Sequence, residues 1–438
     1  MSLYNKASLM MTPSGAKTEK LYSIVPENGN GDFTFDRNEG TATRVNKDGL
    51  IETVAADVPR LDYPLIDGVV QDCPALLLEP ARTQLISYSE DFSNADWTKN
   101  SSTVTLDEII SPDGTQNAAK VESSADGLNS RIEFFPTVSD NTTYTVSIFV
   151  KKGDLNYIRL TLRTKAAVSV AADYDINNGS IGTTFYNPDG TNIQYYGNGW
   201  YRVSITEDVS SGASSVRVQC ILASNDNSVD TDDGAYLYMW GAQVEAGSYP
   251  TSYIPNDGTT ATVTRNADVC NSAGTSAEFN DSEGVLFAEI SALTDDGTSR
   301  RISITDAIGN DFYNLVSIEL DEISGAVKGI VSSGSTVDVL QSSLIQTINN
   351  KISLKYNSSS ISLFINGFKV ESNNSPNLPN GLKELTFSDG KVPQTRPFYG
   401  KTKELAYFKE ALTDSELEAL TSWDSFNDMA VGQEYTIR

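Results

Sequence analysis

Alternation of apolar and polar residues over short segments is the feature that most constrains the fold of this chain. In residues 143–150 every second side chain is apolar, and residues 157–162, 216–221 and 361–365 repeat the pattern. Successive side chains of a strand point to opposite faces, so each segment is typical of a strand. Steps such as Asn178-Gly179, Asp189-Gly190 and Asn366-Gly367 suit tight hairpins. Amphipathic helical patterns are almost absent, and the sequence predicts an all-β fold.

One short helix is predicted near the C-terminus. Thr413 and Glu416 have the spacing of a capping box, in which a hydroxyl and a carboxylate satisfy backbone amides at a helix start. Leu417, Leu420 and Trp423 follow at helical spacing. We expect a helix from about 413 to 422 that packs on the last sandwich.

The 438 residues are enough for two to four domains. Residues 1–84 are predicted to form an irregular N-terminal region, because the Pro and Asp content of residues 57–80 argues against a compact domain. Residues 85–255 and 256–423 each hold enough strand patterns for a jelly roll or β-sandwich, and 424–438 would form a tail. Residues 40–44 and 258–265 share a Thr-rich pattern ending in Arg. This is either chance or a sign that both strands flank one sheet, with the central domain inserted between them.

Composition excludes several classes of function. The chain has no histidine, which rules out Ser-His-Asp and Cys-His catalysis and histidine-ligated zinc. The net charge of -26 disfavours binding to nucleic acid, and no apolar stretch is long enough for membrane insertion. The N-terminus lacks the pattern of a secretory signal. The three widely spaced cysteines indicate buried free thiols and not a disulfide framework.

Several motifs in residues 1–270 are similar to those of phage virion proteins of the tail-fibre, receptor-binding or head-decoration type. The matching segments are 3–9, 42–52, 74–86, 88–92, 240–245 and 249–255. The central region resembles the galactose-binding-like jelly rolls of carbohydrate-binding modules. Residues 361–370 and 400–413 resemble the concanavalin A-like, laminin-G type sandwich.

The resemblance implies a structural protein of the virion, a tail fibre or receptor-binding component that presents sandwiches to host-surface glycans. Other virion proteins are then the expected partners of residues 1–84, and a homotrimer is expected because several weak sites gain avidity together. The alternative is a head-decoration protein with a purely structural role. A bacterial surface adhesin is disfavoured by the missing signal pattern.

Aromatic residues are the candidates for glycan binding, since sugar rings stack on aromatic faces. The candidates are Trp97, Tyr195, Tyr196, Trp200 and Tyr236, with Tyr201, Tyr238 and Trp240 as neighbours of the same kind. Core packing explains the same residues, because aromatics also fill sandwich interiors.

A calcium site is the second candidate. The segment 225–234 concentrates oxygen ligands, namely Asp226, Asp230, Asp232 and Asp233, and residues 295–297 form a shorter candidate. Neither matches the EF-hand spacing. A solvated turn requires the same residue types.

A polysaccharide-degrading enzyme is the least favoured function. Retaining concanavalin-like glycosidases place two carboxylates about 5–5.5 Å apart. Glu319 and Asp321 begin such a pattern, but Ile323 and Ser324 stand where the second glutamate should be. We therefore expect no enzymatic activity.

Overall fold

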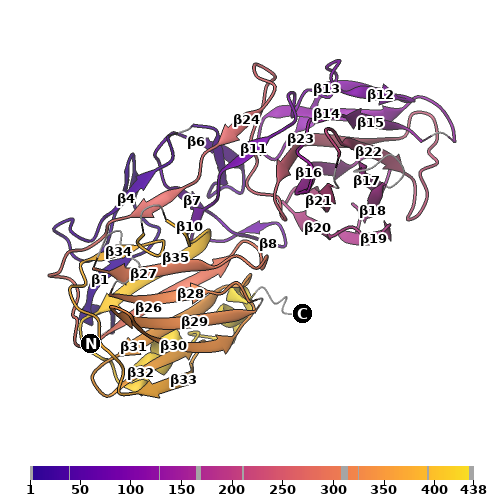
Figure 1. Cartoon of the computed structure of the whole chain (residues 1–438). Helices are drawn as coiled ribbons and strands as arrows, with labels where there is room; N and C mark the ends of the chain where they lie inside the picture. Colours follow the sequence, from indigo (N-terminus) through magenta and orange to yellow (C-terminus); the bar gives the residue numbers. More distant parts are fainter. Residues whose placement is uncertain are drawn as a thin grey trace.

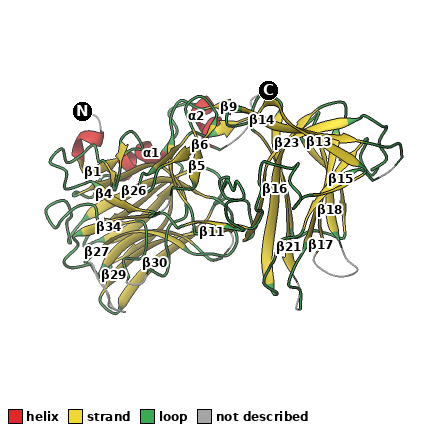
Figure 2. Ribbon diagram, turned by 90° about the horizontal axis from the view of Figure 1, so that it is seen from above, coloured by secondary structure: helices red, strands yellow, loops and turns green. Residues whose placement is uncertain are grey.

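The chain folds almost entirely into β-sheets, as Figures 1 and 2 show. The computed structural model describes residues 3–38, 40–127, 129–163, 169–209, 212–306, 314–323, 325–391 and 394–433. Two β-sandwiches lie side by side and are joined by a region of short strands. The prediction of an all-β chain with tandem sandwiches is confirmed.

The central sandwich consists of two antiparallel sheets. The sheet that lies farther from the C-terminal sandwich is called the distal sheet, and the other the proximal sheet (Figure 2). The distal sheet contains, in spatial order, β12 (Thr98–Asn100), β15 (Arg131–Phe134), β22 (Arg217–Ala223), β17 (Tyr157–Arg163), β18 (Val170–Asp175) and β19 (Ser180–Phe185). The proximal sheet contains β13 (Ser102–Ile110), β14 (Gln116–Ser123), β23 (Tyr236–Ala246), β16 (Thr142–Lys152), β21 (Trp200–Val209) and β20 (Gly190–Tyr195).

Alternation within the strands builds the core of this sandwich. Ile158, Leu160 and Leu162 of β17 point inward and are fully buried. They meet Val146, Ile148 and Val150 of β16, the same residues whose alternation is visible in the sequence. Burial of these apolar faces between the two sheets is the main source of stability.

The C-terminal sandwich also consists of two sheets around one large core. The larger sheet contains β33 (Phe368–Asn374), β32 (Ser360–Ile365), β31 (Asn350–Tyr356), β26 (Gly284–Ala292), β35 (Gly400–Phe408), β10 (Ala75–Leu78) and β7 (Arg60–Asp62), with β1 (Ala7–Met11) also paired to β35. The smaller sheet contains β30 (Thr336–Ser343), β29 (Ala326–Ser333), β28 (Leu315–Leu320), β27 (Arg300–Thr305) and β34 (Glu384–Thr386). Asn366 and Gly367 both adopt positive φ in the tight turn between β32 and β33, as their types predict.

Residues 1–84 differ from the separate N-terminal region that the sequence suggests. Their strands β1, β7 and β10 lie in the larger sheet of the C-terminal sandwich. Leu76 and Leu78 of β10 and Leu9 and Met11 of β1 are buried in its core. The physical reason is that β35 has open backbone groups on its far edge, which β1 and β10 satisfy.

Short strands make up the rest of the N-terminal region and the joint. They are β2 (Ala16–Lys17), β3 (Lys20–Leu21), β4 (Phe33–Asp36), β5 (Ala42–Val45), β6 (Ile51–Val54), β8 (Leu65–Ile66), β9 (Val69–Val70), β11 (Arg82–Gln84), β24 (Val263–Arg265) and β25 (Val269–Asn271). A 3-10 helix, η1 (Leu3–Lys6), precedes β1. The chain enters the central sandwich through β11 and returns through β24, and these two strands pair with each other. The central sandwich is thus an insertion. The similar segments 40–44 and 258–265 do not share a sheet, however, because β5 pairs with β6.

Two hairpins of the N-terminal region reach the central sandwich. Ile51 of the β5–β6 hairpin donates its N–H to the carbonyl of Pro112 at 2.9 Å and packs with Trp200 and Trp240. The turn of the β8–β9 hairpin contacts the turn between β20 and β21, where Gly68 lies against Tyr195 and Gly197.

The predicted C-terminal helix is confirmed as α1 (Asp414–Thr421), with the capping box of Thr413 and Glu416 formed. A second helix, α2 (Phe426–Gly432), lies in the segment predicted as a tail, and Ser425 caps it by accepting from the N–H of Asp428. Of the three free cysteines Cys220 and Cys270 are buried, whereas Cys73 is exposed in the loop before β10. Among the described residues no helix has the length and apolar character needed to cross a membrane.

Candidate binding surfaces

A pocket of about 460 Å³ lies between the two sandwiches. Its walls come from the proximal sheet, from the N-terminal strands and from the larger sheet of the C-terminal sandwich. The lining residues include Thr43, Arg44, Asp62, Tyr63, Leu65, Asn192, Gln194, Tyr196, Arg202, Ser204, Tyr249, Ser291, Thr347 and Lys401. This volume is in the range of small-molecule sites.

The outward face of β20 and β21 forms one wall. Asn192 pairs with Ser204 and Gln194 with Arg202 across the two strands, so all four side chains project to the same side. Arg202 is buried and fixed, because it donates to the Thr251 carbonyl at 2.8 Å and to Ser147 Oγ at 2.9 Å. The side-chain amides of Asn192 and Gln194 are exposed at the mouth of the pocket.

Lys401 and Asp62 form the opposite wall. Lys401 Nζ lies 3.0 Å from Asp62 Oδ2, and Asp62 Oδ1 accepts from the Val45 N–H at 2.9 Å. Burial lowers the pKa of Lys401, but the Asp62 carboxylate outweighs it, and the pKa is raised overall. The lysine therefore stays charged in the pocket.

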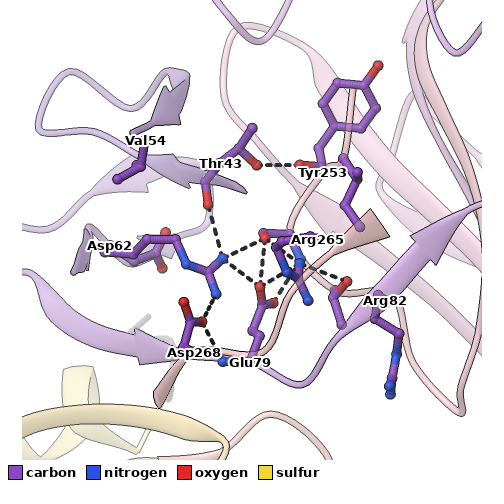
Figure 3. Close-up of polar contacts among 12 residues, drawn as sticks. Thr43, Val54, Asp62, Glu79, Arg82, Tyr253, Arg265 and Asp268 are labelled. Atoms are coloured by element: carbon purple, nitrogen blue, oxygen red, sulfur yellow. Dashed lines mark hydrogen bonds and ion pairs between the residues drawn. The ribbon is translucent and has the colours of Figure 1, made fainter. Parts of the chain in front are cut away.

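A buried network of charged side chains (Figure 3) adjoins the pocket, and its Glu79 is one of the lining residues. Glu79 Oε2 lies 2.6 Å from Arg60 Nη1 and 2.9 Å from Arg265 Nη1. Asp268 pairs with Arg60 and, at 3.2 Å, with Arg37. Burial raises the pKa of Glu79, but Arg265 and Arg60 outweigh it and hold the pKa well below its usual range. The network joins both strands that connect the sandwiches and has a structural role.

Of the predicted glycan-binding residues, Tyr196 lines the pocket, and its ring packs edge-on against Phe149 at 4.9 Å. Trp200 is 2% exposed and donates its indole N–H to the Ile110 carbonyl at 3.1 Å. Trp240 lies in the same buried cluster. Neither tryptophan presents a free ring face to a ligand.

The other aromatic candidates lie apart from the pocket. Trp97 is 1% exposed and packs between Phe92 and Phe134 in the central core, so it presents no ring face. Tyr195 stacks on Tyr201 at 4.8 Å, covered by the β8–β9 turn. Half-buried Tyr236 lies beside Tyr238 at 5.3 Å. The structure does not assemble these rings into one platform.

The predicted calcium ligands are not brought together. Asp226 accepts from the N–H of Thr183 at 2.7 Å and from its hydroxyl at 3.0 Å, which ties the loop to β19. The backbone N–H of Asp233 donates to Asp126, and the Asp232 carbonyl accepts within a turn. Asp230 belongs to the same loop. Across the described ranges no three His, Cys, Asp or Glu side chains form a group that could hold a metal ion. The carboxylates therefore do not fit a calcium site.

The second acidic candidate and the glutamate of the glycosidase-like segment also make local contacts. Asp295 accepts from the Gly325 N–H at 2.9 Å, and Asp296 pairs with Arg300 at 2.8 Å. Glu319 is buried against Arg301, and Asp321 Oδ2 lies 2.8 Å from Lys328 Nζ. Ser324 lies outside the described residues.

Most of the residues that line the pocket are not predicted by the sequence. Asn192, Gln194, Arg202 and Lys401 carry no motif, and only the alternation of β20 and β21 shows that the first three share a face. Lys401 and Asp62 meet because β10 lies between β35 and β7 in the larger sheet, a pairing of segments far apart in the chain.

No protein-family model matches the sequence, and no curated protein sequence matches it significantly. Among solved structures, the chain is similar to a CBM40 of a Ruminococcus gnavus IT-sialidase bound to alpha2,3 sialyllactose. The two share 14% identity with a TM-score of 0.30, and the match covers 33% of this chain and 84% of the CBM40 chain. Domains LG4-5 of the mouse laminin alpha1 chain match with 10% identity and a TM-score of 0.24. This match covers 77% of this chain and 92% of the laminin chain. A Trypanosoma rangeli sialidase in complex with sialic acid matches with 11% identity and a TM-score of 0.29. This match covers 77% of this chain and 63% of the sialidase chain.

Proposed function

We propose that this chain is a glycan-binding structural protein of a phage particle, and that the pocket between the sandwiches holds the glycan. The observation that carries the proposal is the composition of the pocket wall. It combines one aromatic ring, two exposed amides and a fixed charged pair.

These groups suit a saccharide. The Asn192 and Gln194 side chains make no hydrogen bond to the described residues and are free to read hydroxyl groups. Tyr196 supplies an aromatic surface for the apolar face of a sugar ring. Arg202 is held rigidly by Thr251 and Ser147, so the wall is preorganised and little entropy is lost on binding.

The virion location rests on the motifs in residues 1–270 that resemble tail-fibre, receptor-binding and head-decoration proteins. In this proposal the N-terminal region contacts other virion proteins, and the chain assembles as a homotrimer. Three copies raise the effective affinity of a weak pocket. The protein binds and does not cleave its glycan.

A head-decoration protein is the second candidate, with the same sandwiches and no glycan ligand. Cryo-electron microscopy of intact particles with antibody labelling of this chain separates the two. Label at the tail or fibre tips supports receptor binding. Label spread over the capsid lattice, or no label on particles, would overturn it.

A glycan array with the full-length chain tests the pocket itself. We expect retention of host-surface glycans by the wild type and loss of retention in the double variant Asn192→Ala, Gln194→Ala. Gln341→Ala is the matched control, because Gln341 is an exposed amide on β30 of the other sandwich. Equal retention by the double variant and the control would exclude the pocket. Release of reducing ends from a bound polysaccharide would contradict the non-catalytic role.

A further inference from the structure

The outer face of the distal sheet is the part of the central sandwich that points away from the C-terminal sandwich (Figures 1 and 2). Strand alternation sorts its residues. Ile158, Leu160 and Leu162 of β17 enter the core, so Arg159, Thr161 and Arg163 project outward. Val218 and Cys220 of β22 likewise enter the core, and Arg217 and Gln219 project outward. Arg131 and Glu133 of β15 share this face.

Arginines therefore gather on one face of a protein whose net charge is -26. They are Arg131, Arg159, Arg163 and Arg217. Three of them, Arg131, Arg159 and Arg163, have structural partners. Arg131 pairs with Glu133, and Arg159 makes a two-fold contact with Asp173, with Nε and Nη2 at 2.6 and 2.8 Å from its two oxygens. These pairs account for the presence of Arg131 and Arg159 in the sheet.

Arg217 is different. Among the residues that the structure describes it makes no ion pair or side-chain hydrogen bond, and its Nε is buried without a partner. In the sheet it lies directly opposite Arg163. Arg163 has a partner, whereas no ion pair compensates Arg217 in the described parts of the chain. Sheet stability therefore does not explain Arg217.

Two neighbouring groups share this end of the face. Thr161 lies two residues before Arg163 and is 4% exposed. Its hydroxyl has no hydrogen-bond partner in the described parts of the chain. Phe135 directly follows β15, and since Phe134 pairs with Val218, Phe135 stands beside Arg217. Phe135 is 51% exposed. A cation and an exposed aromatic residue thus lie together on the sheet farthest from the C-terminal sandwich.

We propose that this end of the distal sheet is a second saccharide site, which takes the carboxylate-bearing residue of an acidic glycan. Arg217 binds the carboxylate, since the guanidinium fork matches its geometry. Phe135 stacks on the ring of the same or the adjacent sugar.

The site is tested with the full-length chain on an array that carries carboxylated glycans, the same glycans as neutral methyl esters, and sulfated and phosphorylated glycans. We expect retention of the carboxylated glycans, weakened by added salt, and no retention of their esters. Arg217→Gln should weaken binding about tenfold, the size of a lost charged hydrogen bond. Phe135→Ala should weaken it as well.

Arg396→Gln is the matched control, because Arg396 is a partly exposed arginine of the C-terminal sandwich, 3.9 Å from Asp389. It should bind like the wild type. Equal retention of acids and esters, or unchanged binding by Arg217→Gln, would overturn the site. Retention of sulfated or phosphorylated glycans alone would overturn the carboxylate assignment. The pocket variants Asn192→Ala, Gln194→Ala leave this face intact, so failure of the pocket and failure of this site are read separately.

Discussion

Arg265 Nη1 lies 2.9 Å from Glu79 Oε2, and the two side chains are 0% and 4% exposed. Glu79 precedes β11, through which the chain enters the central sandwich, and Arg265 ends β24, through which it returns. This ion pair therefore fastens the two connections at the point where the sandwiches meet. Arg60, from β7, contacts the same Glu79 oxygen and ties in the N-terminal region.

Glu79→Gln should destabilise the protein by about 3–5 kcal/mol, because it leaves Arg60 and Arg265 without their shared carboxylate. The free energy of unfolding, measured by urea titration with tryptophan fluorescence, tests this. Glu52→Gln removes a carboxylate from the partly exposed pair with Arg44 and should cost about 0–1 kcal/mol. Equal losses in the two variants would contradict the central role of Glu79.

The same pair predicts the acid sensitivity of the fold. The pKa of Glu79 lies below its ordinary value of 4.5 in the folded chain. Its contribution is thus fully present above that value and is lost as the pH falls below it. Thermal melts of the wild type should lose stability on acidification more steeply than those of Glu79→Gln.

Glu404 should have the opposite pH dependence. Burial and the facing Glu289 on β26 raise its pKa to about 7, and Tyr4 donates to it at 3.2 Å. The folded chain holds this proton more tightly than the unfolded chain, so stability falls as the pH rises from about 4.5 to about 7. Glu404→Gln should raise the melting temperature at about pH 8 and flatten this dependence. Glu371→Gln, on exposed β33, should leave both unchanged; an equal shift there would contradict the prediction.

Trp97→Ala should act on stability and not on glycan binding. Its ring fills the central core between Phe92 and Phe134, and removal of such a side chain costs about 3–5 kcal/mol. Denaturation measures the loss, and the fraction that remains folded should retain glycans as before. Unchanged stability with abolished retention would show that Trp97 belongs to a binding platform. Trp200→Ala should behave in the same way.

Gly68→Ala should loosen one side of the pocket. A methyl group at Gly68 would lie 2.4 Å from the Tyr195 ring and 2.8 Å from the Gly197 nitrogen. The β8–β9 hairpin must then leave the β20–β21 turn, and hydrogen exchange in residues 65–70 should rise. Gly334→Ala has the same positive φ strain but meets no atom within 4 Å, so it separates the clash from the strain. Equal exchange in both variants would argue against the contact.

The sequence by itself determined the features that depend on near neighbours. The pleat sends adjacent side chains to opposite faces, so the alternation in residues 143–150 and 157–162 predicted strands β16 and β17 and their buried sides. The Asn366-Gly367 turn and the capping box of Thr413 and Glu416 are equally local, and both formed as predicted. The same local patterns suggested Trp97 and Trp200 as glycan-binding residues, although both are buried. The position of an aromatic residue in the sequence does not show whether other side chains cover its ring.

Only the tertiary structure decided which strands pair, and with them the pocket. The sequence predicted a separate region for residues 1–84, whereas β1, β7 and β10 complete the C-terminal sandwich. The Tyr4 hydroxyl donates a hydrogen bond to Glu404, which is 400 residues away in the sequence. The gathering of Asn192, Gln194 and Lys401 around one cavity has the same origin. Pairing depends on the sum of backbone hydrogen bonds and core contacts between distant segments, and no short window of sequence contains that sum.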